Sequence, residues 1–261
     1  MLSRIENGAA LPSLGTINYL AMRLNVSPGY LIADADDEQI YYKYNEINDI
    51  KKAYIAEDYR ICHAMCKSSK SIDDDEIRLI LSECSLAIGI EEFNSGNLKN
   101  ACVYFDEAIE NCSSTIYHTG YIVAVAGVYF KYMKALSSTL EPSVLDTDKA
   151  NLYASFSNDF CIYAMLLDNY DLSTIIPSLC TLHEESPYSM HLLAKKKMND
   201  NNFEEGYKIL HDILYGEKKV PQPVIYSIIC DLEKCCKELN DYKGAYEYSN
   251  EKLSMLQKML S

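Results

Sequence analysis

The sequence predicts an all-α protein, and three observations support this fold class. Apolar residues recur at spacings of three and four along most of the chain, which is the period of an amphipathic helix. No stretch reads convincingly as a strand with alternating apolar and polar residues. Hydrophobic residues make up 48% of the 261 residues, with 22 tyrosines and no tryptophan. Such a chain is long enough for one or two helical domains with a large core.

Residues 2–31 are predicted to form three short helical segments separated by turns. Asn7-Gly8 ends the first segment, because both residues tolerate positive φ. The second segment begins at Pro12, with Ser13 as a possible cap, and it ends at Asn25. Leu14, Ile17, Leu20, Ala21 and Leu24 follow at spacings of three and four and are predicted to form its apolar face. Ser27-Pro28 then opens a short third helix.

This stretch resembles the lambda-repressor-like (Xre) helix-turn-helix family. The residues that carry the resemblance are Ser3 to Gly8, Pro12-Ser13, Leu20-Ala21, Leu24, Val26-Ser27 and Leu31. The match covers the second half of such a domain, so it implies that residues 2–7 are the C-terminal end of a recognition helix. It also implies DNA contacts by Ser3, Arg4 and Asn7, with Arg4 near the base edges and Asn7 near a phosphate.

The chemistry of these side chains suits duplex DNA. A guanidinium such as that of Arg4 can bond guanine or phosphate, and an amide such as that of Asn7 can bond a phosphate oxygen. The residues that begin base readout in this family would precede Ser3, whereas this sequence begins at Met1. We therefore expect the chain to bind duplex DNA poorly, and the two missing helices to rescue binding. A helical hairpin with no DNA contact remains the alternative.

The charge distribution separates the N-terminal residues from the rest. The net charge is −14, which argues against nucleic acid over most of the surface. Residues 1–33 hold Arg4 and Arg23 against Glu6, a net +1, which leaves −15 for the remaining residues. This split fits a DNA-facing segment on an acidic body. The resemblance implies a partial DNA-binding domain at 1–33, followed by linker helices at 34–72 and a helical body at 73–261.

Ten cysteines without a signal peptide indicate reduced, packed thiols in the cytoplasm. No apolar run approaches the ~20 residues that a membrane span needs. Cys62 and Cys66 share a helical face, but the sequence supplies no second pair of metal ligands. The acidic run 73–76 is better explained as a helix cap with acids in the first turn than as a metal cluster. We therefore expect no metal and no cofactor.

Further helices are predicted along the rest of the chain. A long helix at 40–67 is expected to break once near 45–49. The others are predicted at 77–93, 98–111, 117–136, 149–167, 174–182, 189–198 and 242–260, with a loop at 141–143. The last helix presents Leu253, Leu256 and Leu260 with no later element to cover them. It is therefore the expected contributor to a homodimer, unless it folds back.

The body resembles the tetratricopeptide repeat (TPR). The first copy is carried by Gly89, Phe93, Gly96, Ala101, Phe105 and Ala108. The pattern returns at Ala194, Phe203, Gly206, Leu210 and Ile213, and again at Tyr242 and Ala245. The resemblance implies stacked antiparallel helix pairs in a right-handed α-solenoid with a concave face.

Two functions follow from these domains. A helix-turn-helix head before TPR-like repeats resembles the Rgg/PlcR-like regulators, which implies a DNA-binding transcription regulator with a body that senses a peptide or protein and dimerises. The alternative is a TPR-like peptide-binding or protein-binding scaffold with a truncated head that does not bind DNA. We do not expect an enzyme, because the sequence has no Gly-rich phosphate loop, no GxSxG and no HExxH.

The repeat alignment also places candidate peptide-binding residues. If the first helix of each repeat lines the groove, the side chains expected there are Asn94, His191, Lys195, Asn199, Lys234 and Lys237. An asparagine amide can bond a peptide backbone of any sequence, and lysines favour a peptide carboxylate. The alternative for Asn94 and Asn199 is that they only end their helices, since asparagine is common before such turns.

Overall fold

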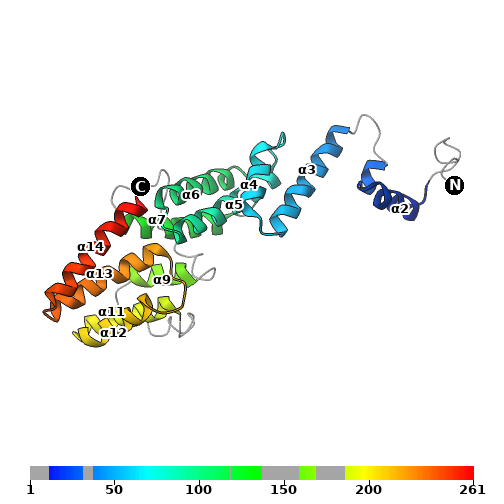
Figure 1. Cartoon of the computed structure of the whole chain (residues 1–261). Helices are drawn as coiled ribbons and strands as arrows, with labels where there is room; N and C mark the ends of the chain where they lie inside the picture. The colour runs from blue at the N-terminus through cyan, green and yellow to red at the C-terminus, as the bar shows by residue number, and fades with distance from the viewer. Residues whose placement is uncertain (1–11, 32–37, 118, 137–158, 169–185) are drawn as a thin grey trace. The chain divides into compact units, whose positions relative to one another are not determined.

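The computed structural model describes residues 12–31, 38–117, 119–136, 159–168 and 186–261. These residues form eleven α-helices and one 3-10 helix without any strand, which confirms the all-α prediction (Figure 1). The chain divides into two compact units, residues 1–77 and residues 78–261.

The first unit begins with a helix whose two caps agree with the sequence prediction. Helix α2 (Leu14–Leu24) starts at Ser13, whose hydroxyl accepts a hydrogen bond from the Thr16 N–H at 3.2 Å. It ends at Asn25, which adopts the left-handed conformation with φ 54°. The 3-10 helix η1 (Pro28–Leu31) follows directly, as the Ser-Pro pair predicts.

The break in the predicted helix at 40–67 lies elsewhere than expected. Residues 45–49 are helical, because helix α3 spans Glu38–Ile55 and helix α4 spans Tyr59–Ser68. The chain reverses at Glu57, which has φ 60°, and the Asp58 N–H bonds to the Ala53 carbonyl at 3.1 Å. The prediction near 45–49 was wrong, because α3 runs without interruption through these residues and ends only at Ile55.

Acidic side chains start helix α5 (Asp75–Asn94), as predicted for the run 73–76. The Asp74 carboxylate accepts a hydrogen bond from the Glu76 N–H at 3.0 Å, which satisfies an amide at the helix start. Two lysines of α3 pair with this segment: Lys43 lies 2.6 Å from Asp74, and Lys51 lies 2.6 Å from Glu76. Ion pairs therefore connect α3 to the start of α5.

The second unit contains most of the helices. They are α6 (Leu98–Ser113), α7 (Gly120–Leu136), α9 (Asp159–Asp168), α11 (Pro187–Asn199), α12 (Phe203–Leu214), α13 (Gln222–Glu238) and α14 (Tyr242–Met259). The helices predicted at 77–93, 98–111, 117–136, 189–198 and 242–260 are confirmed with small changes at their ends. The loop at 141–143, the helix at 174–182 and the start of the helix at 149–167 lie outside the described residues.

One turn geometry joins three helix pairs of this unit. Gly96, Asn201 and Asn240 each have φ between 60° and 85° and each lies between two consecutive helices. In each turn the next residue donates its N–H to the carbonyl five positions earlier, as Asn97 does to Glu92, Asn202 to Lys197 and Asp241 to Cys236. Left-handed residues with these bonds end a helix tightly and let the chain return along it.

A small buried residue follows each turn at a constant distance. Ala101, Gly206 and Ala245 come five positions after the three left-handed residues. In the first unit the α3–α4 turn repeats this pattern, with the buried Cys62 five positions after Glu57. The interval between turns also recurs, because Glu57 and Gly96 are 39 residues apart, as are Asn201 and Asn240. These helix pairs therefore share one turn conformation and the position of one small buried residue.

The paired helices approach closely where the TPR-like pattern places small residues. A Cβ atom added to Gly89 would lie 2.7 Å from Cε1 of Phe105, so the phenyl ring occupies the space beside this glycine. A Cβ atom added to Gly206 would lie 3.4 Å from the Ala194 carbonyl oxygen and 2.9 Å from the Met198 side chain. Helices α11, α12, α13 and α14 pack each against the next in chain order (Figure 1).

An aromatic cluster forms the centre of the core in the second unit. Its rings come from α5, α6, α7 and α9, and they are Phe93, Phe105, Tyr129, Phe130, Tyr132, Phe160 and Tyr163. The centroid of Phe93 lies 4.8 Å from those of Tyr129 and Phe160, in edge-on and tilted orientations that aromatic pairs favour. This cluster therefore holds α7 and α9 against the α5–α6 pair.

Replacing Gly89 by alanine is expected to destabilise the protein by about 1–2 kcal/mol, although alanine is the better helix former. The added methyl group meets the ring of Phe105, which is fully buried and in contact with Tyr129 and Phe130. Urea unfolding followed by circular dichroism measures this change. Gly120→Ala is the matched control, because a Cβ atom there meets nothing within 4 Å. Stabilisation of both variants would contradict the close approach.

Candidate functional site

A pocket of about 260 Å³ lies among four helices of the second unit and is the strongest candidate for a ligand site. Its lining residues come from α7, α9, α11 and α13. They are Val128, Lys131, Tyr132, Ala135, Leu136, Ala164, Met165, Leu167, Lys195 and Ser227. Most of these are apolar, whereas two lysines and two hydroxyl groups supply the polar atoms, which is the usual composition of a small-molecule site.

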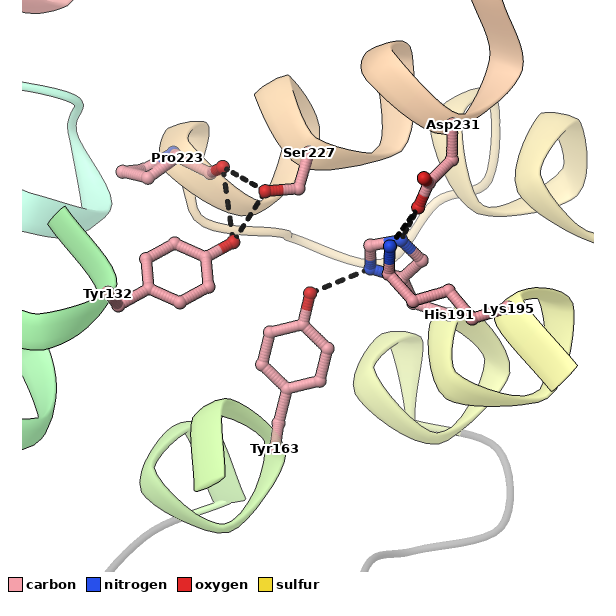
Figure 2. A network of polar contacts seen from close by, with 7 residues as sticks. All are labelled: Tyr132, Tyr163, His191, Lys195, Pro223, Ser227 and Asp231. Atoms are coloured by element: carbon pink, nitrogen blue, oxygen red, sulfur yellow. Dashed lines mark hydrogen bonds and ion pairs between the residues drawn. The ribbon is translucent and has the colours of Figure 1, made fainter. Parts of the chain in front are cut away.

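A buried polar network holds Lys195 at the pocket. The Lys195 ammonium lies 2.6 Å from Oδ2 of Asp231, which comes from the facing helix α13 (Figure 2). The same carboxylate oxygen lies 2.8 Å from Nε2 of His191, one turn before Lys195 on α11. Nδ1 of His191 in turn lies 2.7 Å from the hydroxyl of Tyr163 on α9. The network therefore connects α9, α11 and α13.

The protonation of His191 follows from its partners. Burial lowers the pKa of this imidazole below 6.5, and the positive charge of Lys195 lowers it further, although the hydrogen bond and charge of Asp231 act the other way. The ring is therefore neutral at pH 7 and has one donor nitrogen. Because an ionised carboxylate only accepts, Nε2 donates to Asp231 and Nδ1 accepts from the Tyr163 hydroxyl.

The carboxylate of Asp231 stays ionised despite its burial. Burial alone would raise its pKa, but the hydrogen bond from His191 and the charge of Lys195 outweigh that effect and lower the pKa to about 2. The side chain is only 14% exposed. A buried charge of this kind needs both of its partners, so Asp231, His191 and Lys195 form one structural unit.

The order carboxylate, imidazole and hydroxyl also occurs in hydrolases with an activated nucleophile. Here the hydroxyl belongs to Tyr163, which is fully buried and is not among the residues that line the pocket. Burial raises the pKa of Tyr163 well above its ordinary value, so the phenol keeps its proton and donates it in a hydrogen bond. This geometry supports a role in helix packing.

A second pair of hydroxyl groups lies on the pocket wall. The Tyr132 hydroxyl is 2.8 Å from Oγ of Ser227 and 3.4 Å from the carbonyl oxygen of Pro223, which also accepts from Ser227 at 3.3 Å (Figure 2). Burial raises the pKa of Tyr132, so its hydroxyl remains a donor. These bonds tie α7 to the start of α13.

The structure brings only two of the predicted peptide-binding residues together. Lys195 lines the pocket, and His191 is fully buried behind it with both ring nitrogens hydrogen-bonded. Asn94 and Asn199 are exposed and are the last residues of α5 and α11, the position that the helix-ending alternative predicts.

The remaining predicted residues lie elsewhere. Lys234 is exposed on α13, and Lys237 on the same helix lies 2.6 Å from the buried carboxylate of Glu233. The Lys252 ammonium of α14 also pairs with Glu233. The predicted DNA-binding residues Ser3, Arg4 and Asn7 lie outside the described residues.

Sequence reasoning missed Asp231 and Tyr163, although both carry the site. Asp231 belongs to no recognisable motif, and its partner His191 lies 40 residues away. One signal was present: buried cysteines and apolar residues surround Asp231 in the sequence of α13, and a charge among buried residues requires a partner. That signal does not identify the partner.

The apolar stripe predicted on the last helix is partly covered. Leu256 and Leu260 pack against the core of the second unit, so α14 folds back onto α13. Leu253 is 54% exposed, and Tyr242 and Tyr246 on the same helix are each 69% exposed.

Comparison with models of protein families, with curated proteins and with solved structures found no match for this chain. Among the described residues, none of the helices has the length and apolar character that a membrane crossing requires. No group of three or more histidine, cysteine or acidic side chains suited to a metal ion occurs in the described part of the chain.

The stability of the folded chain is expected to fall as the pH decreases through about 6.5, with His191 contributing to the decrease. Its pKa is lower in the folded state than in the unfolded state, so protons bind the unfolded state first and favour it. His191→Gln, which keeps a side-chain donor without a titrating group, should flatten the dependence. Melting temperatures at about pH 7.5 and about pH 5.5 measure this pH dependence. In a domain of this size, each kcal/mol of lost stability lowers the melting temperature by roughly 2–4 °C. An equal decrease in both proteins would contradict this assignment.

Proposed function

We propose that this chain is a DNA-binding transcription regulator whose helical-repeat unit senses a peptide or protein ligand and dimerises. In the first unit, support comes from the order of caps at Ser13 and Asn25 followed by η1, which agrees with the helix-turn-helix resemblance. In the second unit, support comes from the three helix pairs with one turn geometry. Stacked helical repeats commonly present an extended binding surface.

The observation that carries the ligand-sensing part is the pocket beside Lys195. It lies in the repeat unit, and the repeat alignment independently places Lys195 on the ligand-binding side. A concave site lined by apolar groups and a few oriented polar groups is the usual form of a ligand site.

A homodimer belongs to the proposal, because helix-turn-helix regulators read paired half-sites. Tyr242, Tyr246 and Leu253 follow one another at spacings of four and seven, so they share one face of α14, and each is more than half exposed. We expect this face to contact a second copy. Sedimentation equilibrium at tens of micromolar protein tests the assembly, and a monomer at that concentration would count against it.

A scaffold that does not contact DNA is the second candidate, and the charge distribution favours it. Residues 1–33 carry a net +1 within a chain of net −14. DNA binding depends largely on lysine and arginine contacts to phosphates, so this surplus is small.

Selection from a pool of randomised DNA duplexes separates the two candidates. We expect weak enrichment of a recurring half-site at a low salt concentration of about 50 mM, where phosphate contacts are strongest. Arg4→Ala should lose about 1–3 kcal/mol on the enriched duplex, while Lys218→Ala in the second unit should leave its affinity unchanged. The scaffold is favoured if the selected pool contains no recurring site and the Arg4→Ala variant retains as much DNA as the unchanged chain.

A further inference from the structure

We propose that the pocket among α7, α9, α11 and α13 binds the carboxylate end of an amphipathic molecule, with Lys195 at the carboxylate and the apolar wall of α9 against its tail. The chemistry is that of a single carboxylate on a short apolar group. Both the free C-terminus of a peptide with an apolar last residue and a small free carboxylic acid have this chemistry.

The charged groups that line the pocket are both lysines. Lys131 and Lys195 line it, and Asp231, which contacts Lys195, is not among the lining residues. An ammonium group on the pocket wall attracts a carboxylate and repels a second cation.

The Lys195 ammonium is positioned and retains hydrogen-bonding capacity. Its ion pair with Asp231 uses one oxygen, and an ammonium has three N–H donors. Among the described residues Asp231 is its one ion-pair partner, and the lysine side chain is 19% exposed. Because His191 holds the same carboxylate oxygen, Asp231 keeps its place when Lys195 turns a donor towards a ligand.

The rest of the pocket suits a short apolar group. Its apolar lining consists of Ala164, Met165 and Leu167 of α9 together with Val128 and Leu136 of α7. Its volume of about 260 Å³ lies just below the range of about 300–1,000 Å³ for drug-sized ligands. The space therefore fits a branched or linear aliphatic group of a few carbons beside a carboxylate.

This inference rests on the ligand-sensing part of the proposed function and names the subsite for it. It does not depend on DNA binding by the first unit. A peptide ligand and a free acid would share this subsite and differ in what lies beyond the carboxylate.

Calorimetric titration of the full chain tests the subsite with four probes: N-acetyl-leucine, its C-terminal amide, N-acetyl-alanyl-leucine and hexanoate. We expect both N-acetylated free acids to bind and the amide to bind about tenfold more weakly or not at all, since charge-assisted hydrogen bonds are the strong ones. Tighter binding of the dipeptide than of hexanoate identifies a peptide end as the ligand, and the reverse order identifies a free acid.

Three variants locate the site. Lys195→Met should reduce the affinity for the free acids about tenfold or more, while Lys196→Met on the same helix should leave it unchanged. Because Lys195→Met also removes a partner of the buried Asp231, Ala135→Phe provides a second test. Ala135 is an exposed residue of the pocket lining, so its replacement fills the pocket and leaves the polar network intact.

Equal binding of acid and amide would overturn the proposal, as would free-acid binding that Ala135→Phe leaves unchanged. Absence of binding by every probe up to about 5 mM would overturn it as well. Enrichment of random peptides by the same protein, in the absence of any acid binding, would remove this subsite while the proposed function remained.

Discussion

Replacing Asp231 by alanine is expected to destabilise the second unit by about 3–5 kcal/mol, because the change breaks a buried ion pair and leaves its partners unpaired. The Lys195 ammonium loses its counter-charge, and Nε2 of the buried His191 loses its acceptor. Equilibrium unfolding in urea measures the loss, as a lower midpoint with an unchanged slope. Asp212→Ala on the exposed side of α12 is the matched control and should change stability by less than about 0.5 kcal/mol.

The stability that Asp231 contributes is also expected to depend on pH. The folded pKa of Asp231, about 2, lies below its ordinary value of 3.8, so the ionised carboxylate stabilises the fold at pH values above 3.8. This contribution is lost as the pH falls from about 4 towards 2. The difference in stability between wild type and Asp231→Ala should therefore shrink over that interval. A constant difference would show that Asp231 acts by shape rather than by charge.

Phe93→Ala is expected to cost about 3–5 kcal/mol, since it removes a fully buried ring from the aromatic cluster. The ring contacts Tyr129 and Phe160 at centroid distances of 4.8 Å and Tyr132 at 6.0 Å. The cavity left behind loosens α7, which carries Tyr132 and Lys131 at the pocket. In thermal unfolding, the melting temperature should fall by roughly 2–4 °C for each kcal/mol of stability lost.

An exposed residue gives the comparison for Phe93. Val103 is 64% exposed on α6, so Val103→Ala should change stability by less than about 0.5 kcal/mol. Phe93→Leu fills most of the cavity and should fall between the two. A loss for Phe93→Ala no larger than that for Val103→Ala would contradict the packing of this cluster.

The helices of this chain follow largely from local signals in the sequence. Ser13 and Asn25 mark the two ends of α2, because a hydroxyl at the start and a left-handed asparagine at the end satisfy free backbone groups. Gly89 and Ala101 predict the α5–α6 pair by a second local signal, because small residues at TPR-like spacing let two helices approach closely. Such signals act over a few residues, so they can be read without knowing the fold.

The turn at Glu57 shows the limit of these signals. Glutamate rarely adopts positive φ, so nothing in its type predicts the left-handed conformation. Its interval of 39 residues to Gly96 and the small buried Cys62 five positions later identify it once the other turns are known. The segment 34–72, predicted as linker helices, therefore contains a helix pair with the same turn as the body.

The candidate site depends on contacts that the sequence does not encode locally. Lys195 was predicted on the ligand-binding side from its repeat position, and the pocket includes it. Asp231 and Tyr163 reach His191 from helices 40 and 28 residues away, so their roles depend on how the helices stack. Tertiary packing of this kind is not visible in periodicity or capping.

The central claim is that the repeat unit is a ligand-binding body, and affinity selection of random heptapeptides with free C-termini tests it most directly. The double variant Asn94→Ala with Asn199→Ala decides whether those amides bind the peptide backbone: unchanged affinity with an intact fold would leave both as helix-ending residues.

The account predicts that the full chain enriches a related set of peptides, and that the Lys195→Met variant no longer binds them. A chain that enriches no peptide over a blank column would contradict the central claim.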